Sequence, residues 1–229
     1  MADRPIIFSA PMVRALLDGR KTQTRRKFEL PANSGRMKLS AMPNIRECKW
    51  QRGDRLWVRE AWRIGAWDWN NAQIAVDYCD GPRKEWLAVD DGDMLHRLID
   101  QSRADAVKAG LPLRYSYYEY SWSPGHSPCR WRSPIHMPRW ASRLTLLVTD
   151  VRVQRLQEIS EADAKAEGVG GVCWEDWRDY GGPSSYRLPF RSLWNSIHGH
   201  DAWDDNPWVA AISFTVHRCN IDKMEEGTW

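Results

Sequence analysis

The sequence lacks long apolar runs and a glycine-rich phosphate loop, and each absence excludes a class of protein. No apolar stretch approaches the roughly 20 residues that a membrane-spanning helix needs. The amino-terminal residues MADRPIIFSA do not have the form of a secretory signal. The absence of a GxxxxGK motif argues against nucleoside triphosphate hydrolysis. We therefore expect a cytoplasmic protein that does not enter a membrane.

Cysteines are few and dispersed. The five are Cys48, Cys79, Cys129, Cys173 and Cys219. Their number is odd and no two form a CxxC pair, so a disulfide framework or a cysteine-rich zinc site is not expected. The HGH segment at 198–200 and the aspartates after it provide no third or fourth ligand at a known zinc spacing. We expect reduced thiols, no metal and no cofactor.

Tryptophan and positive charge are abundant instead. The 229 residues include 15 tryptophans, which either fill a small core or form a stacking surface for bases. Residues 1–60 carry fourteen Lys or Arg and six Asp or Glu, a local charge of +8 within a total of +3. This asymmetry favours an anionic partner such as a phosphate backbone.

Local patterns predict short strands with few helices. We expect strands at 4–8, 55–60, 72–78, 113–118, 142–156 and 208–217, with an extended segment at 21–26. Helices are expected between Ser9 and Gly19 and at 94–108, 161–167 and 190–197. The strand at 142–156 changes phase near Thr149-Asp150, which predicts a bulge or bend of the kind that a small closed barrel requires.

The chain length fits one large domain, or one domain with an insertion. We expect a single α+β domain over 1–219, built around a small barrel, with an inserted elaboration at about 62–135. Residues 29–52 are predicted to be a long basic loop because they contain several Pro, Asn and Gly residues, and residues 170–189 are predicted to be a loop that contains Gly and Trp. Residues 220–229 are expected to form a flexible tail.

The densest polar cluster is Gly19-Arg-Lys-Thr-Gln-Thr-Arg-Arg26. Nearby cations and burial disfavour the charged form of Lys21, and a lysine with a lowered pKa can act as a general base toward a threonine hydroxyl. Extended residues three apart point to opposite faces, however, so a shared site for Lys21 and Thr24 requires a turn or bulge between them.

This cluster and five later segments resemble the ASCH domain, a relative of the PUA-like RNA-binding barrels. The segments are GDRLWVRE, SPIHMPRWASRLTLLVTDVRVQRL, ISEADAKAEGV, FRSLWNSIHG and NPWVAAISF. Together they cover about half of the chain and look most like the longer ASCH proteins of phages and prophages. The resemblance implies a PUA-like (ASCH) small β-barrel with flanking helices in a bacterial or phage-encoded protein.

The resemblance also implies a set of catalytic residues. Small bacterial ASCH enzymes that hydrolyse N(4)-acetylcytidine use a lysine, a threonine and a glutamate, which correspond here to Lys21, Thr24 and Glu167. Lys21 would take a proton from Thr24, whose oxygen attacks the acyl carbon, and Glu167 would orient Lys21 or a water, or protonate the leaving amine. This chain is about twice the length of those enzymes, so its substrate is open: a free modified nucleoside, or a modified base in RNA or DNA.

Other residues are candidates for binding substrate: Arg20, Arg26, Trp57, Arg59, Glu60, Arg139 and Trp140. Glu60 could pair with Lys21 or form a structural salt bridge. Arg139 and Trp140 could clamp a base or pack at the entry to a strand. The sequence favours an amidohydrolase, and the alternatives are a non-catalytic RNA- or DNA-binding module and an ASCH-type ribonuclease.

Overall fold

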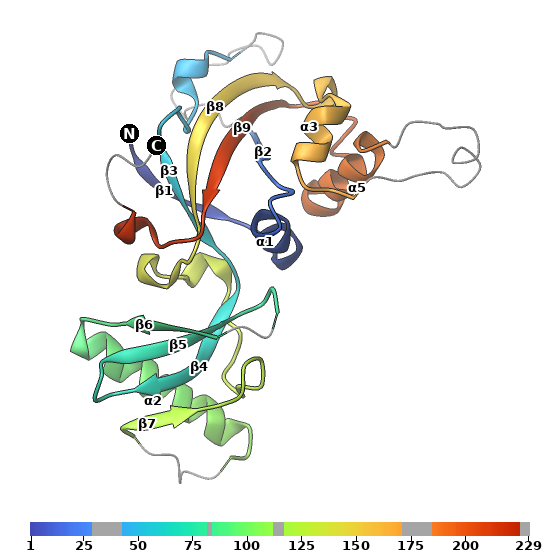
Figure 1. Ribbon diagram of the computed structural model, residues 1–229. Coiled ribbons are helices and arrows are strands. Elements are labelled where there is room, and N and C mark those ends of the chain that lie inside the picture. The colour runs from blue at the N-terminus through green and yellow to red at the C-terminus, as the bar shows by residue number, and fades with distance from the viewer. Residues whose placement is uncertain (29–42, 82–83, 112–116, 171–184, 225–229) are drawn as a thin grey trace, which may run out of the picture. The chain divides into compact units, whose positions relative to one another are not determined.

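The computed structural model describes residues 1–28, 43–81, 84–111, 117–170 and 185–224, and its architecture is mixed α+β (Figure 1). One sheet has five strands in the order β1 (Asp3–Ile7), β3 (Arg55–Arg59), β8 (Thr145–Arg155), β9 (Trp208–His217), β2 (Gln23–Lys27). The other has four in the order β6 (Lys84–Ala88), β5 (Gln73–Tyr78), β4 (Trp62–Asp68), β7 (Glu119–Ser121). The expected α+β class is confirmed. Because β1 and β2 are outer strands of the first sheet, no closed barrel is formed by the described strands.

The described part of the chain contains few helices, as the sequence predicted. They are α1 (Ala10–Leu17), α2 (Gly92–Lys108), α3 (Glu161–Ala166) and α5 (Arg187–His198). Single 3-10 turns lie at Ile45–Glu47, Pro134–His136, Arg139–Ala141, Leu156–Glu158 and Ile221–Lys223. Among the described helices, none is both long enough and apolar enough to cross a membrane.

The chain forms two compact units. The first comprises Met1–Arg4, Arg14–Leu56 and Leu146–His217, and the second comprises Pro5–Val13, Trp57–Thr145 and Arg218–Trp229. The segment at 62–135, expected as an elaboration, lies within the second unit.

The first unit places β2, α3 and α5 around one apolar cluster. β2 pairs with β9 in an antiparallel register in which Thr24 lies opposite Ile212. Phe190 and Trp194 on α5 pack with Ala164 of α3, as the apolar spacing of the helix requires. The Ser160 hydroxyl accepts a hydrogen bond from the Asp163 amide and begins α3. Gly168, at a φ of 80°, follows the helix and lets the chain turn away.

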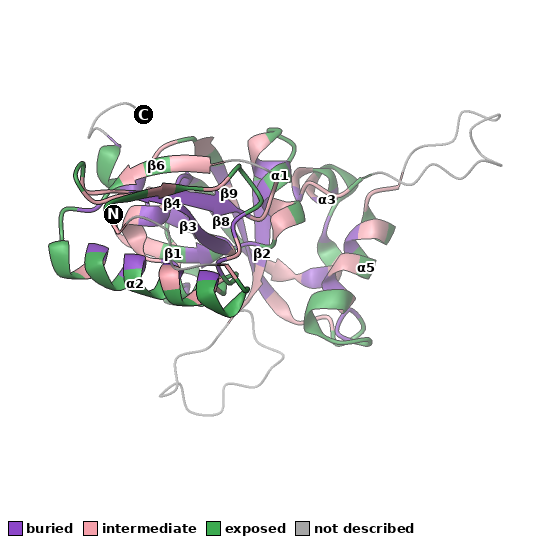
Figure 2. Ribbon diagram, turned by 90° about the horizontal axis from the view of Figure 1, so that it is seen from below, coloured by how far each residue is buried: buried purple, intermediate pink, exposed green. Residues whose placement is uncertain are grey.

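The second unit has its own core. Large indole rings dominate it, with Trp62 and Trp67 on β4 almost fully buried. The helix α2 adds Leu95, Leu98 and Ile99 from one of its faces, while most of its other residues are exposed (Figure 2). Many tryptophans therefore serve as core material, although Trp86 and Trp131 remain nearly half exposed.

Several local predictions are confirmed. The last strand, β9, has the predicted bounds, and α1, α2, β3 and β5 lie within two residues of theirs. The phase change in the 142–156 strand is also present, because the consecutive residues Thr149 and Asp150 of β8 are both exposed between buried residues. The expected strand at 113–118 and the two long loops lie largely outside the described residues.

The flexible tail predicted at 220–229 is wrong for residues 220–224. Residues 221–223 form a 3-10 turn in which Ile221 is fully buried, and Met224 is also buried. Asn220 donates to the carbonyl groups of Arg139, Trp140 and Ser142, which fixes the segment to the second unit. Burial of Ile221 and these hydrogen bonds offset the entropy lost by ordering the segment. Residues 225–229 lie outside the described residues.

Candidate functional site

Lys21 and Glu167 meet at the junction of two chain segments that are far apart in sequence. The Lys21 Nζ donates to the Glu167 carboxylate at 2.8 Å and to the Glu167 carbonyl at 2.9 Å. Lys21 is fully buried and Glu167 is 5% exposed. The two residues also form an isolated antiparallel bridge. The pairing that the resemblance implied is therefore present as a buried ion pair.

Arg25 and Asp163 extend this pair into a buried cluster. Arg25 donates to the second Glu167 oxygen at 3.1 Å and to Asp163 at 3.1 Å. Gln23 donates to Asp163 and accepts from Arg25, so every polar side chain of the cluster has a partner. Lys21, Gln23 and Arg25 alternate along an extended segment and point to one face. Asp163 and Glu167 are four residues apart and share one face of the α3 turn.

Burial and charge compete in this cluster. Burial lowers the pKa of the Lys21 ammonium, against the opposing pull of Glu167, and the neighbouring Arg26 and Arg25 lower it further. Burial also lowers the pKa of the Arg26 guanidinium. Burial alone would raise the pKa of Asp163, but the hydrogen bond that it accepts from Arg152 and its proximity to Arg25 hold that pKa below the usual value. A lysine in these surroundings loses its proton more readily than one in water.

Thr24 does not join this cluster. Gln23 and Arg25, its neighbours on β2, both contact Asp163, so regular strand alternation turns the Thr24 side chain to the opposite face. No turn or bulge interrupts the register of β2. The structure thus brings Lys21 and Glu167 together and leaves Thr24 apart, because the irregular backbone that the three-residue site required is absent.

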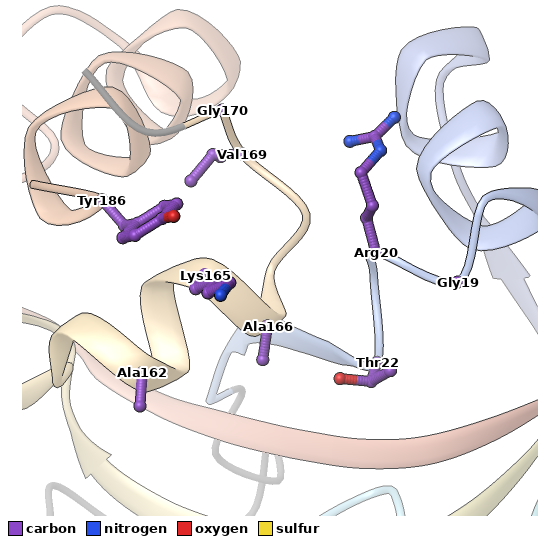
Figure 3. A pocket seen from close by; sticks show the side chains of 9 residues that line it. All are labelled: Gly19, Arg20, Thr22, Ala162, Lys165, Ala166, Val169, Gly170 and Tyr186. Carbon is purple, nitrogen blue, oxygen red and sulfur yellow. The ribbon is translucent and has the colours of Figure 1, made fainter. Parts of the chain in front are cut away.

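A cavity of about 600 Å³ lies beside the cluster. Its lining residues are Gly19, Arg20, Thr22, Ala162, Lys165, Ala166, Val169, Gly170 and Tyr186. Figure 3 shows Lys165 and Tyr186 on one side and Arg20 across from them, with the Thr22 hydroxyl turned toward Ala166. Thr22 lines the cavity because it alternates with Lys21, whose side chain points away from it into the buried cluster.

The described lining combines an aromatic ring with positive charge. The Lys165 Nζ lies 5.7 Å from the centre of the Tyr186 ring. Arg20 is anchored by the Gly168 carbonyl at 3.0 Å and by Asp18 at 2.8 Å. A guanidinium has five N–H donors, so this anchoring leaves donors for a ligand or water. Among the described lining residues there is no acidic side chain.

Several residues predicted to bind substrate are engaged within the protein instead. Both oxygens of Glu60 accept from Arg143 at 2.9 Å, so Glu60 forms a structural salt bridge and does not pair with Lys21. Trp57 is buried, and the Arg59 guanidinium lies over its ring at 4.4 Å. A ring already covered by an arginine and by the core does not offer a free stacking face.

Arg139 and Trp140 are likewise occupied. Arg139 makes a two-pronged contact with Asp222, with distances of 2.8 and 2.6 Å. Trp140 packs edge-on against Trp62, with ring centroids 6.2 Å apart. The structure therefore matches the packing interpretation of this pair.

The cysteines and the other possible metal ligands form no site in the part of the chain described. The four cysteines within it are all free thiols, and Cys173 lies outside it. No group of three or more His, Cys, Asp or Glu is arranged there to hold a metal ion.

Sequence reasoning missed two features of this site. Two patterns in the sequence together predict the buried cluster. They are the alternation of Lys21, Gln23 and Arg25 and the four-residue spacing of Asp163 and Glu167. The approach of Tyr186 to Thr22 had no such signal, because only the tertiary fold brings the start of α5 to that turn.

Comparisons of the chain with protein-family models, with curated proteins and with solved structures found no match.

Proposed function

We propose that this protein is an ASCH-type binding module for single-stranded RNA or DNA, and that one base of the ligand enters the cavity between Thr22 and Tyr186. The observation that carries the proposal is the lining of that cavity: one aromatic ring, two cationic side chains and no acid among its described residues. Aromatic rings stack on any base, and cations bind the adjoining phosphates.

Size and charge support the same ligand. A volume of about 600 Å³ falls within the roughly 300–1,000 Å³ of small-molecule sites and accommodates a nucleoside with its phosphate. The charge of +8 over residues 1–60 attracts a polyanion.

The PUA-like assignment of the fold belongs to this proposal as well. The long β8, whose side-chain alternation shifts at Thr149 and Asp150, supports this assignment, because small barrels use bent strands; the described five-stranded sheet itself stays open between β1 and β2.

The test is binding of a fluorescently labelled single-stranded RNA, followed by anisotropy over a range of salt concentrations. We expect affinity to fall steeply with salt, because phosphate contacts release counterions. Tyr186→Ala should weaken binding by about 5- to 150-fold, the cost of one base stack. Arg20→Gln and Lys165→Gln should each weaken binding and reduce its salt dependence.

Arg191→Gln is the matched control, since Arg191 is an exposed cation of α5 that does not line the cavity. Equal losses in Arg191→Gln and Lys165→Gln would show that only diffuse charge matters. Unchanged RNA binding in Tyr186→Ala would contradict the proposal that a base of the ligand enters this cavity.

A second candidate is the amidohydrolase, and the buried Lys21–Glu167 pair is the observation that favours it. Lys21 has a lowered pKa and contacts the glutamate that the resemblance implies. In this mechanism neutral Lys21 takes the proton of a threonine hydroxyl, and the threonine oxygen attacks the acyl carbon. The bond to the base nitrogen breaks as Lys21 passes that proton to the leaving amine, and water then hydrolyses the acyl-threonine ester to release the carboxylic acid and regenerate the hydroxyl. Thr22 is better placed than Thr24 with respect to the cavity, although the Lys21 amine points away from it.

An absorbance assay of N(4)-acetylcytidine decides between the candidates. Release of cytidine that Lys21→Met abolishes, in a variant that keeps its circular dichroism spectrum, supports the enzyme. Comparing Thr22→Val with Thr24→Val then identifies the hydroxyl that reacts. Absence of release by the unmodified protein overturns this candidate, and labelled RNA that stays intact without added metal overturns the ribonuclease alternative.

A further inference from the structure

The second unit contains a cavity of its own, separate from the residues discussed so far as a binding site. It has a volume of about 410 Å³ and is lined by strand β6 and by the segments around Arg143 and Arg218. The residues that matter for its chemistry are Glu85, Trp86, Arg143, Arg218, Cys219 and Lys223.

Arg143 is a rigidly held cation on the wall of this cavity. Its Nε and Nη2 donate to Glu60, and Nη2 also donates to Asp80 at 2.6 Å. Its guanidinium lies 4.0 Å from the centre of the Tyr78 ring, and only 5% of its side chain is exposed. These contacts fix the orientation of the group before any ligand arrives.

The remaining nitrogen of Arg143 has no hydrogen-bond partner among the described residues. This atom, Nη1, is buried. It forms an ion pair with Glu85 Oε1 at 3.6 Å, a separation that is too long for a hydrogen bond. A buried donor without an acceptor costs free energy, and a ligand oxygen would recover it. The Glu85 side chain is 41% exposed, so it can swing outward and leave its place to such an oxygen.

The other groups of the cavity favour an anion beside an aromatic ring. Arg218 and Lys223 are exposed cations on the lining, and Trp86 is 45% exposed on the same wall. Glu60 and Asp80, which do not line the cavity, both accept hydrogen bonds from Arg143. The neutral polar groups are occupied too, since the Ser142 hydroxyl and the Asn220 amide both bond to backbone carbonyls.

We infer that this cavity binds a phosphate group attached to an aromatic moiety, as in a nucleotide or a nucleic-acid strand. A phosphate oxygen replaces the Glu85 carboxylate next to Arg143 Nη1, and Arg218 and Lys223 neutralise the remaining charge. The attached base packs on Trp86. This site does not depend on the function proposed for the first unit.

Isothermal titration calorimetry with the full chain tests the inference. The probes are inorganic phosphate, uridine monophosphate and an eight-residue oligouridylate. The double variant Arg218→Gln/Lys223→Gln should weaken binding at least tenfold, while Arg97→Gln, an exposed cation of α2 away from the cavity, should not change it. Glu85→Gln should tighten binding several-fold, because it removes a like charge from the phosphate position.

The probes also separate the two sources of phosphate. Nucleotide binding tighter than inorganic phosphate, with the difference lost in Trp86→Ala, supports a single nucleotide, and binding of the oligouridylate alone supports a strand. A second readout is alkylation of Cys219, which the bound ligand should slow in peptide mass spectrometry. Absence of binding by all three probes, weaker binding in Glu85→Gln, or an equal loss in Arg97→Gln would overturn the inference. The Arg20→Gln and Lys165→Gln variants of the first unit should leave these affinities unchanged, which separates the two proposals.

Discussion

The substitution Glu167→Gln tests the buried cluster most directly. It keeps the size of the side chain and removes its charge, so the Lys21 ammonium loses the carboxylate that it contacts at 2.8 Å. Arg25 loses one of its two acidic partners and keeps Asp163. Breaking a buried ion pair by removing one partner costs about 3–5 kcal/mol, because the other charge stays buried.

The lower end of that range is the better expectation. Burial has already lowered the pKa of Lys21, so the amine can release its proton once Glu167 is neutral and thereby limit the loss. A loss of about 3 kcal/mol corresponds to a fall in melting temperature of about 6–12 °C for a chain of this length. Scanning calorimetry measures that fall, and hydrogen exchange of the peptides around 21–27 and 161–168 locates it.

Asp18→Asn is the matched control, because Asp18 pairs with Arg20 through side chains that are each more than half exposed. Exposed pairs contribute about 0–1 kcal/mol. The double variant Lys21→Met/Glu167→Gln should lose less than the sum of its two single variants, since it removes both charges together. A loss in Glu167→Gln no larger than in Asp18→Asn, or strict additivity in the double variant, would refute the reasoning.

Three further predictions concern single residues. Arginine partners hold the pKa of Asp163 below its usual 3.8, so its contribution to stability is present above that value and disappears as the pH falls through the lower folded-state pKa. In acid titrations the free energy of unfolding should therefore fall less steeply in Asp163→Asn than in the unmodified protein, and parallel curves would contradict this. Gly168→Ala should destabilise by about 1–3 kcal/mol in urea unfolding, because φ is 80° and the added carbon would lie 2.8 Å from Lys21 Cβ; wild-type stability would disprove this. Ile221→Ala should cost about 2–5 kcal/mol by the same measurement, since Ile221 is fully buried, whereas a change below 1 kcal/mol would mean that the segment is a tail after all.

The local elements were accessible from the sequence because their causes are local. The alternation of Trp208–His217 predicted β9 with its observed bounds, and the Ser160 cap with Gly168 predicted α3. The tail was predicted wrongly at 220–224 because nothing in the short run NIDKM indicates that Ile221 finds a buried place in the second unit.

The candidate site was predicted in part. The pairing of Lys21 with Glu167 followed from a resemblance in short segments, and the structure brings the two residues into contact. The inclusion of Thr24 failed because the alternation of β2 continues without interruption. The pairing of Glu60 with Arg143 could not be foreseen, since 83 residues separate them and many other basic residues were available.

By itself, the sequence determined the α+β class, most strand and helix positions, and the basic character of the first sixty residues, because these depend on periodicity, capping and charge along the chain. Only the tertiary structure decided which face each polar residue occupies and which distant partner it meets. The tertiary structure buries the Lys21 amine and forms the cavity that Thr22 and Tyr186 line. It also leaves one Arg143 nitrogen without a hydrogen-bond acceptor among the described residues. The physical reason is that partners and burial arise from packing between segments that no local pattern connects.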